Sequence, residues 1–170
     1  MPLSHGGGQE RQLRSGTFDT PAISGFAAAV VATTTTLDSE TARVTALRDR
    51  LIERATGLGV GIRPGGYWRP GDHERRLPGN AHLLIDGCDG DSLLYLLDAA
   101  GVSCSTGSAC QAGVPQPSHV LLAMGISEKD ARGALRLSLG HTSTESDVDE
   151  VIEALPAAIE RARRARQVSA

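Results

Sequence analysis

The chain has 170 residues, a formal net charge of -3 and a sequence pI near 5.9, and aromatic residues make up only 3% of it. A chain of this length can bury one core, whereas its acidic balance and few aromatic residues argue against nucleic acid or an anionic membrane as partner. No apolar run looks long enough to span a bilayer, and three cysteines without an export signal predict reduced thiols in the cytoplasm.

The first part of the chain is predicted to contain two helices. Residues 1–20 are polar and glycine-rich, which indicates a loop that needs something to pack on. The alanine-rich run 21–32 opens with proline and predicts a largely buried helix. The threonines at 33–36 are expected to interrupt the chain before a second helix. The apolar face of that second helix carries Val44, Leu47, Leu51 and Ile52.

The middle of the chain alternates breakers with short apolar runs. Residues 57–80 are dense in glycine and proline, which predicts an irregular connection with one short strand. The apolar run 82–85 predicts a strand, and 91–98 a helix that ends at Gly101. Residues 103–118 are small and polar and predict a long loop.

The last part carries the clearest patterns. A short helix is expected over 118–124, and Ser127 with Asp130 resembles a capping box for another. Alternation over 135–139 predicts a strand. Thr144 is expected to cap a final amphipathic helix that Pro156 should kink. Strands alternating with helices predict an α/β or α+β layer, in which helices pack on one small sheet.

Cys110 lies in the middle of the small-residue loop, where few side chains could anchor the backbone. Such a loop should be mobile and leave the thiol accessible, as a reactive cysteine requires. From composition alone, a reactive thiol and a tolerated surface cysteine remain equally open.

Four collinear segments resemble the group I cysteine desulfurases, which are pyridoxal-phosphate enzymes of the class V aminotransferase family. Ser105 to Cys110 is similar to their active-site cysteine loop. Gly6 to Thr17 is similar to their GGGQERxxRSGT segment, Arg76 to Asn80 to the segment before a strand, and Ala134 to Gly140 to their substrate-arginine strand. The resemblance implies the small C-terminal domain of a fold-type I enzyme over 37–170, and part of the large domain with the inter-domain helix over 1–36.

The resemblance also implies roles for single residues. Cys110 would take the sulfur of L-cysteine as a persulfide, and Arg136 would bind the substrate carboxylate with its bidentate fork. Thr17 would bind the cofactor phosphate across the interface of a homodimer. The alternatives are an exposed strand arginine for Arg136 and a turn residue for Thr17. Gly6–Gly8 resemble a phosphate cradle only weakly.

The other cysteines and the histidines suggest no further site. Cys88 and Cys104 lack the spacing of metal ligands, and we expect core or loop thiols. The histidines are scattered, so no metal site is predicted. His119 and His141 lie near the proposed site in sequence and could support it. The full set is His5, His73, His82, His119 and His141.

The chain departs from the family in one respect. The cofactor lysine, the ring-stacking histidine and the aspartate at the pyridine nitrogen of the family all precede the segment that Gly6–Gly8 resemble. Lys129 is the only lysine, in a polar stretch that follows a helix cap, so it is not expected to replace the cofactor lysine. We therefore expect the chain alone to be inactive, with pyridoxal phosphate requiring an N-terminal portion.

Two functions of different classes remain open. The first is part of a desulfurase that passes sulfur to an acceptor, such as an iron–sulfur scaffold or a tRNA-thiolation protein. The second is a non-catalytic persulfide carrier or docking module. A selenocysteine lyase or an aminotransferase is a weaker third possibility, because an aminotransferase would not need Cys110.

Overall fold

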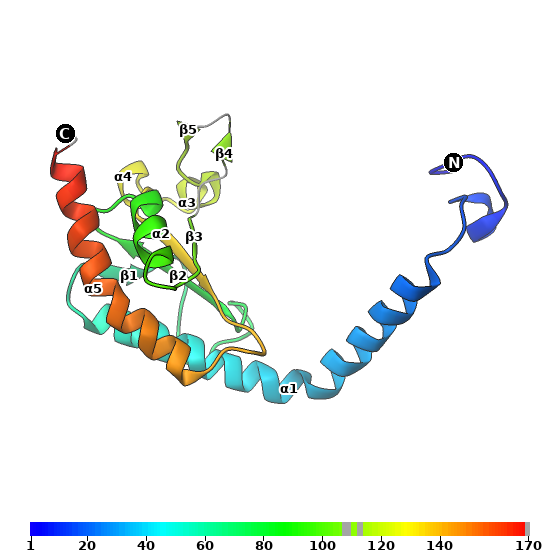
Figure 1. Cartoon of the computed structure of the whole chain (residues 1–170), viewed down its shortest axis with the longest axis horizontal. Coiled ribbons are helices and arrows are strands. Elements are labelled where there is room, and N and C mark those ends of the chain that lie inside the picture. Colours follow the sequence, from blue (N-terminus) through cyan, green and yellow to red (C-terminus); the bar gives the residue numbers. More distant parts are fainter. Residues whose placement is uncertain (107–109, 112–113, 169–170) are drawn as a thin grey trace. The chain divides into compact units, whose positions relative to one another are not determined.

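The structure is a computed structural model that describes residues 1–106, 110–111 and 114–168, and only the backbone of 110–111, 114–115 and 168. It divides into two compact units, Met1–Leu37 and Asp38–Ala170, and each is described by itself. Figure 1 shows the elements in chain order.

The first unit begins with a closed loop. A bridge between Ser4 and Arg14 and a bond from the Leu3 amide to the Leu13 carbonyl (2.7 Å) hold its two ends together. The 3-10 helix η1 (Gln9–Gln12) lies between them, with positive φ at residues 10–12. The expected loop is therefore locally ordered. Asp19 then accepts from the Ala22 amide (3.0 Å) as α1 (Thr20–Gly57) begins.

The helix α1 corrects two expectations. Residues 33–36 do not interrupt it, because the hydroxyls of Thr34, Thr35 and Thr36 donate to carbonyls four residues earlier in the same helix. The part over 21–32 is exposed in its unit, not buried. α1 is also apolar enough to cross a membrane by length and composition, with a mean hydropathy of 1.2 over 18 residues. One such helix is weak evidence, since core helices of soluble proteins pass the same criterion.

The second unit is built on a four-stranded antiparallel sheet of order β1-β2-β6-β3. The strands are β1 (Ile62–Pro64), β2 (Asn80–Ile85), β3 (Ser105–Thr106) and β6 (Ala134–Ser138). Pro64, which has no backbone N–H, is tolerated in β1 because β1 is an edge strand, which has a hydrogen-bonded neighbour on one side only. The strands predicted at 82–85 and 135–139 and the short strand in 57–80 are confirmed.

Four further helices agree with the predicted ones. They are α2 (Gly90–Asp98), α3 (His119–Ala123), α4 (Glu128–Ala131) and α5 (Glu145–Val168). Ser127 Oγ accepts from the Asp130 amide (3.2 Å), and Thr144 exchanges two bonds with Asp147, so both predicted caps form. The helix α5 continues through Pro156.

Both faces of the sheet are covered. One face carries the main core, in which Leu83 and Leu135 pack with side chains from α1, α2 and α5. On the other face Leu84 packs with Leu121 of α3 and Ala131 of α4. Burying each such leucine stabilises the fold by about 1.5–3 kcal/mol. The expected layer of helices on a small sheet is thus present, with helices on both faces.

Ion pairs join α1 to α5 beside the main core. Arg50 contacts Glu145 (2.6 Å) and Asp149 (3.0 Å), and Arg54 contacts Asp149 as well. Figure 1 shows α5 lying along the C-terminal half of α1. The ion pairs therefore link the two helices that pack on the sheet. Exposed pairs of this kind each add little to the stability of the fold.

Candidate functional site

Arg136 lies at the centre of the sheet face that is opposite the main core. Along β6 the side chains of Leu135 and Leu137 are buried, whereas Arg136 and Ser138 are exposed. Successive side chains of a strand point to opposite faces of the sheet. Because the two leucines point into the main core, the guanidinium of Arg136 lies on the face of the sheet that is turned away from the main core.

The sheet register places Ser105, the first residue of the predicted cysteine loop, beside Arg136. Ser105 of β3 is paired with Arg136, and its Oγ accepts a bond from Arg136 Nη2 (3.3 Å). The strand β3 leads directly into the segment that contains Cys110. Within that segment the backbones of β4 (Cys110–Gln111) and β5 (Val114–Pro115) pair as a short hairpin that was not predicted. The side chain of Cys110 and residues 107–109 and 112–113 lie outside the described residues.

A cleft of about 590 Å³ opens over this face of the sheet. The strands β2, β6 and β3 line the cleft with His82, Arg136 and Thr106. Residues of the helix α3 line it as well. The connection between β1 and β2 lines another side, with Arg75 and Arg76 among its residues. The cleft thus combines Arg136 with the start of the cysteine loop.

The charge in the cleft is positive, because Arg75, Arg76 and Arg136 line it and no carboxylate is among the lining residues. The guanidinium of Arg76 already makes hydrogen bonds within the chain, because it donates to the carbonyls of Gly65, Tyr67 and Asn80 at 2.7–3.1 Å. Arg75 lies over the ring of Tyr67, 5.2 Å from its centroid. Arg136, with its one hydroxyl contact to Ser105, is the cation best placed to bind an anion in the cleft.

His82 also lines the cleft, although its sequence context predicted no role for it among the scattered histidines. It stands directly opposite Arg136 in the strand register, and its ring packs against Gly65, where a Cβ would lie 1.9 Å from Nδ1. Burial, followed by the charges of Arg76 and Arg136, lowers the pKa of His82. The ring is thus neutral at pH 7. The two-residue period along β2 was the signal that could have placed it on this face.

The remaining thiols are unsuited to nucleophilic chemistry. Cys88 is fully buried and its Sγ lies 3.8 Å from the Ile159 carbonyl, and Cys104 is half-buried. Burial raises the pKa of both thiols, so less of each is thiolate at neutral pH. This agrees with their assignment as core or loop thiols. Among the residues that the structure describes, no group of three or more His, Cys, Asp or Glu could hold a metal ion.

The predicted cofactor residues do not form a complete site for pyridoxal phosphate. Thr17 is exposed in the first unit, just before α1, and could offer a hydroxyl to a phosphate. Lys129 is exposed on α4 and is not among the residues that line the cleft. His119 and His141 are exposed as well, and neither lines the cleft. Among the described residues, these side chains therefore do not complete a site for the cofactor by themselves.

Comparisons with known proteins agree with these features. A family model described as Aminotransferase class-V matches residues 4–151. The IscS-like cysteine desulfurase of Mycobacterium tuberculosis (strain ATCC 25618 / H37Rv) is 53% identical, over 100% of this chain and 42% of that protein. Cysteine desulfurase IscS 1 of Archaeoglobus fulgidus is 41% identical, over 96% of this chain and 41% of that protein.

Solved structures give the same picture. A NifS-like protein from Rickettsia africae ESF-5 superposes with a TM-score of 0.76 at 29% identity, over 94% of this chain and 40% of that one. Another NifS-like protein gives a TM-score of 0.71 at 30% identity, over 98% of this chain and 39% of that one. The chain thus spans about 40% of the length of the relatives that it matches.

Proposed function

Because the chain belongs to the class-V aminotransferase family, and has the fold of fold-type I NifS-like proteins, we propose that it is the C-terminal portion of a cysteine desulfurase. Residues 37–170 form the small domain, and residues 1–36 belong to the large domain and the helix that joins the two. The observation that carries the proposal is the pairing of Ser105 with Arg136, which sets the base of the Cys110 loop beside the cationic centre of the cleft.

Arg136 binds the carboxylate of L-cysteine in this proposal. Its guanidinium is planar and presents two parallel N–H donors, which match the two oxygens of a carboxylate. The lowered pKa of His82 favours the neutral ring, which has no positive charge to draw the carboxylate away from Arg136. A lysine would supply the charge at this position but not the paired donors.

Cys110 accepts the sulfur. In the overall exchange a sulfur–sulfur bond forms on Cys110 and the carbon–sulfur bond of the substrate breaks. Hydrogen takes the place of sulfur on carbon, which gives L-alanine without an outside oxidant. The persulfide can then pass to an acceptor protein, for which an iron–sulfur scaffold is one candidate.

Pyridoxal phosphate supplies the electron sink of this chemistry in the family. We assign most of its site to an N-terminal portion of the kind that the longer relatives have, with Thr17 as one phosphate ligand across a homodimer interface. The exposed position of Lys129 supports this division, because no other lysine is present in the 170 residues. On this proposal the 170 residues alone are inactive, and the enzyme works in the cytoplasm.

The test uses the chain joined to such an N-terminal portion. Cys110→Ser should abolish the persulfide and alanine production from L-cysteine, whereas Cys88→Ser and Cys104→Ser should retain both. Arg136→Lys should raise KM for L-cysteine by about tenfold or more, because one bidentate charged contact is lost. Persulfide mapped by mass spectrometry to Cys104 would contradict the assignment.

The same material tests the alternative role as a persulfide carrier. A carrier would take up persulfide from a separate desulfurase without binding pyridoxal phosphate, even when joined to the N-terminal portion. Cofactor absorbance and alanine production by the joined protein favour the enzyme. Uptake of persulfide with neither of these favours the carrier.

A further inference from the structure

A buried ion pair on α1 lies under the connection between β1 and β2. The side chain of Arg48 is completely buried, and that of its neighbour Asp49 is 11% exposed. The two groups are 2.8 Å apart at Nη2 and Oδ1. A buried pair of this kind is costly to desolvate unless further hydrogen bonds satisfy its remaining donors and acceptors.

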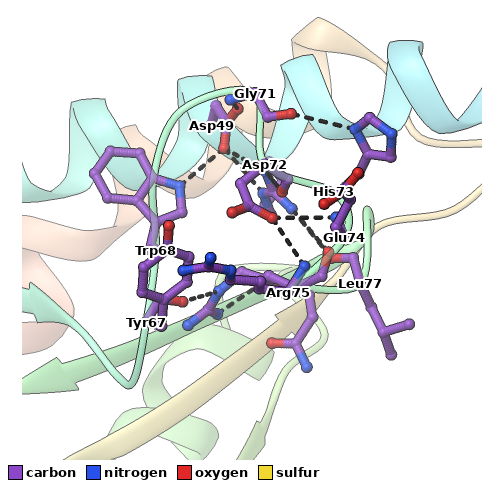
Figure 2. A network of polar contacts seen from close by, with 12 residues as sticks. Asp49, Tyr67, Trp68, Gly71, Asp72, His73, Glu74, Arg75 and Leu77 are labelled. Atoms are coloured by element: carbon purple, nitrogen blue, oxygen red, sulfur yellow. Dashed lines mark hydrogen bonds and ion pairs between the residues drawn. The ribbon is translucent and has the colours of Figure 1, made fainter.

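The connection supplies those hydrogen bonds. Arg48 donates to the carbonyls of Asp72 (2.9 Å) and Leu77 (3.2 Å), and Asp49 accepts from Trp68 Nε1 (2.8 Å) and from the Gly71 amide (2.7 Å). Figure 2 shows Asp49 between Trp68 and Gly71, with Asp72 beside it. Arg48 also donates to the Arg76 carbonyl (3.5 Å), so the pair holds the segment 67–77 at five points.

The same segment forms one side of the cleft that contains Arg136. Tyr67 and Arg76 line the cleft, and the side chain of Arg76 donates to the Gly65 and Asn80 carbonyls, which ties the segment to β1 and β2. At Gly66, which directly precedes the segment, a Cβ would lie 2.9 Å from the end of the side chain of Met124, the residue that follows α3. Because residues of the segment line the cleft, the position of the segment affects the shape of the cleft.

We infer that Arg48 and Asp49 are positioning residues, which fix the segment 67–77 and thereby the shape of the cleft around Arg136. The structural half of this inference concerns the chain itself. The functional half, that the pair governs the affinity for L-cysteine, rests on the function proposed above. Neither side chain lines the cleft, so both act through the segment that they hold.

The first experiment measures hydrogen exchange by mass spectrometry on the 170-residue chain. Asp49→Asn keeps the size of the side chain but removes the charge that pairs with Arg48 and an acceptor of the Gly71 amide. Exchange in peptides covering 67–77 should rise by about tenfold or more, while peptides from β2 and β6 change little. The control is Asp149→Asn, which removes an exposed carboxylate from Arg50 and Arg54 and should leave 67–77 unchanged.

Unchanged exchange in 67–77, or an equal rise in all peptides, would overturn the inference. If Asp49→Asn does not fold, Trp68→Phe removes one donor and keeps an aromatic ring, and a smaller but local rise is expected. No local rise in that variant overturns the inference equally.

The second experiment uses the chain joined to its N-terminal portion. Asp49→Asn should raise KM for L-cysteine by about fivefold and leave kcat within about twofold, because binding loses alignment while Cys110 and its loop are intact. A fall in kcat with KM unchanged would contradict the role in binding. If the unaltered protein releases no sulfur from L-cysteine, the proposed function fails, and the exchange experiment still decides whether the pair positions the segment.

Discussion

Burial separates the three thiols of the chain at the scale of single residues. Cys88 and Cys104 are held where burial raises the thiol pKa, whereas the sequence around Cys110 offers no bulky side chain to cover it. The thiolate is the reactive form, so a raised pKa slows alkylation at neutral pH.

The first prediction concerns these thiols in the native chain. Iodoacetamide at pH 7.5 should label Cys110 fastest, Cys104 more slowly and Cys88 last, because Cys88 is fully buried. Peptide mass spectrometry over a time course measures the three rates. Denatured chain is the control, in which the rates should converge. Equal labelling of Cys110 and Cys88 in the native chain would contradict the prediction.

His82 gives a second prediction at this scale. Its pKa is lowered in the folded chain, first by burial and then by Arg76 and Arg136, so the unfolded chain binds the proton more readily. The contribution to stability is complete above the ordinary histidine value of about 6.5 and is lost as the pH falls from there toward the lowered pKa.

Urea unfolding at several pH values between 7.5 and 5 tests this. The chain should lose stability over this interval, and His82→Asn, which does not titrate, should lose less of it. His73→Asn is the matched control, because His73 is exposed and its replacement should leave the pH dependence as it was. An unaltered pH dependence in His82→Asn would show that other groups cause it.

At the scale of elements, periodicity predicted the elements that have one buried and one exposed face. The alternation of Leu135, Arg136 and Leu137 gave both a strand and the face on which the arginine stands. The expected break at residues 33–36 was wrong, because threonine hydroxyls can bond back to the helix that they seemed to end. A threonine that ends a helix and one whose hydroxyl bonds back to a carbonyl inside the helix cannot be told apart in the sequence.

The irregular connection over 57–80 shows what could not be predicted. Its glycines and prolines indicated correctly that it would hold little regular structure. Its path depends on Arg48 and Asp49 of α1, and Asp49 precedes its partner Trp68 by 19 residues. In sequence the two residues resemble the exposed charges around them. Contacts between distant segments leave no periodic signal in the sequence. The position of the segment that lines this side of the cleft could therefore be seen only in the structure.

Close packing between the elements gives a third prediction. A Cβ at Gly133, which precedes β6, would lie 2.2 Å from the carbonyl oxygen of Ile85 at the end of β2. The obstacle is backbone, so Gly133→Ala should destabilise the domain by about 1–3 kcal/mol, as overpacking does. Chemical denaturation measures the change.

Gly57 at the end of α1 is the control for that substitution. Apart from its chain neighbours and the nearby backbone of its own helix, no atom of the described residues lies within 4 Å of a Cβ built there. Gly57→Ala should therefore be neutral or stabilising by about 0.5–1 kcal/mol through its better helix propensity. Equal losses in the two variants would mean that the close approach at Gly133 is not the cause.

At the scale of the whole molecule, the chain matches about 40% of the length of its relatives. Within that length it has a cleft lined by Arg136 and by Thr106, which precedes the segment that contains Cys110. Its single lysine stands outside the cleft on a short helix. The proposed function divides the residues that bind the substrate from those that anchor a cofactor, and this proposed division can be tested on the chain alone.

The fourth prediction is that the 170-residue chain forms no stable adduct with pyridoxal phosphate at a defined site. A Schiff base in such an enzyme is held by contacts to the cofactor's phosphate and ring as well as by its lysine, and exposed Lys129 on α4 lies outside the cleft that could provide them. The chain should be mixed with the cofactor, passed through gel filtration and reduced with borohydride. Mass spectrometry should then find at most a trace of label on Lys129, no more than on the same chain unfolded in urea. A stoichiometric adduct on Lys129 that needs the folded chain would show that the cofactor has a site in this portion, and would overturn the proposed division.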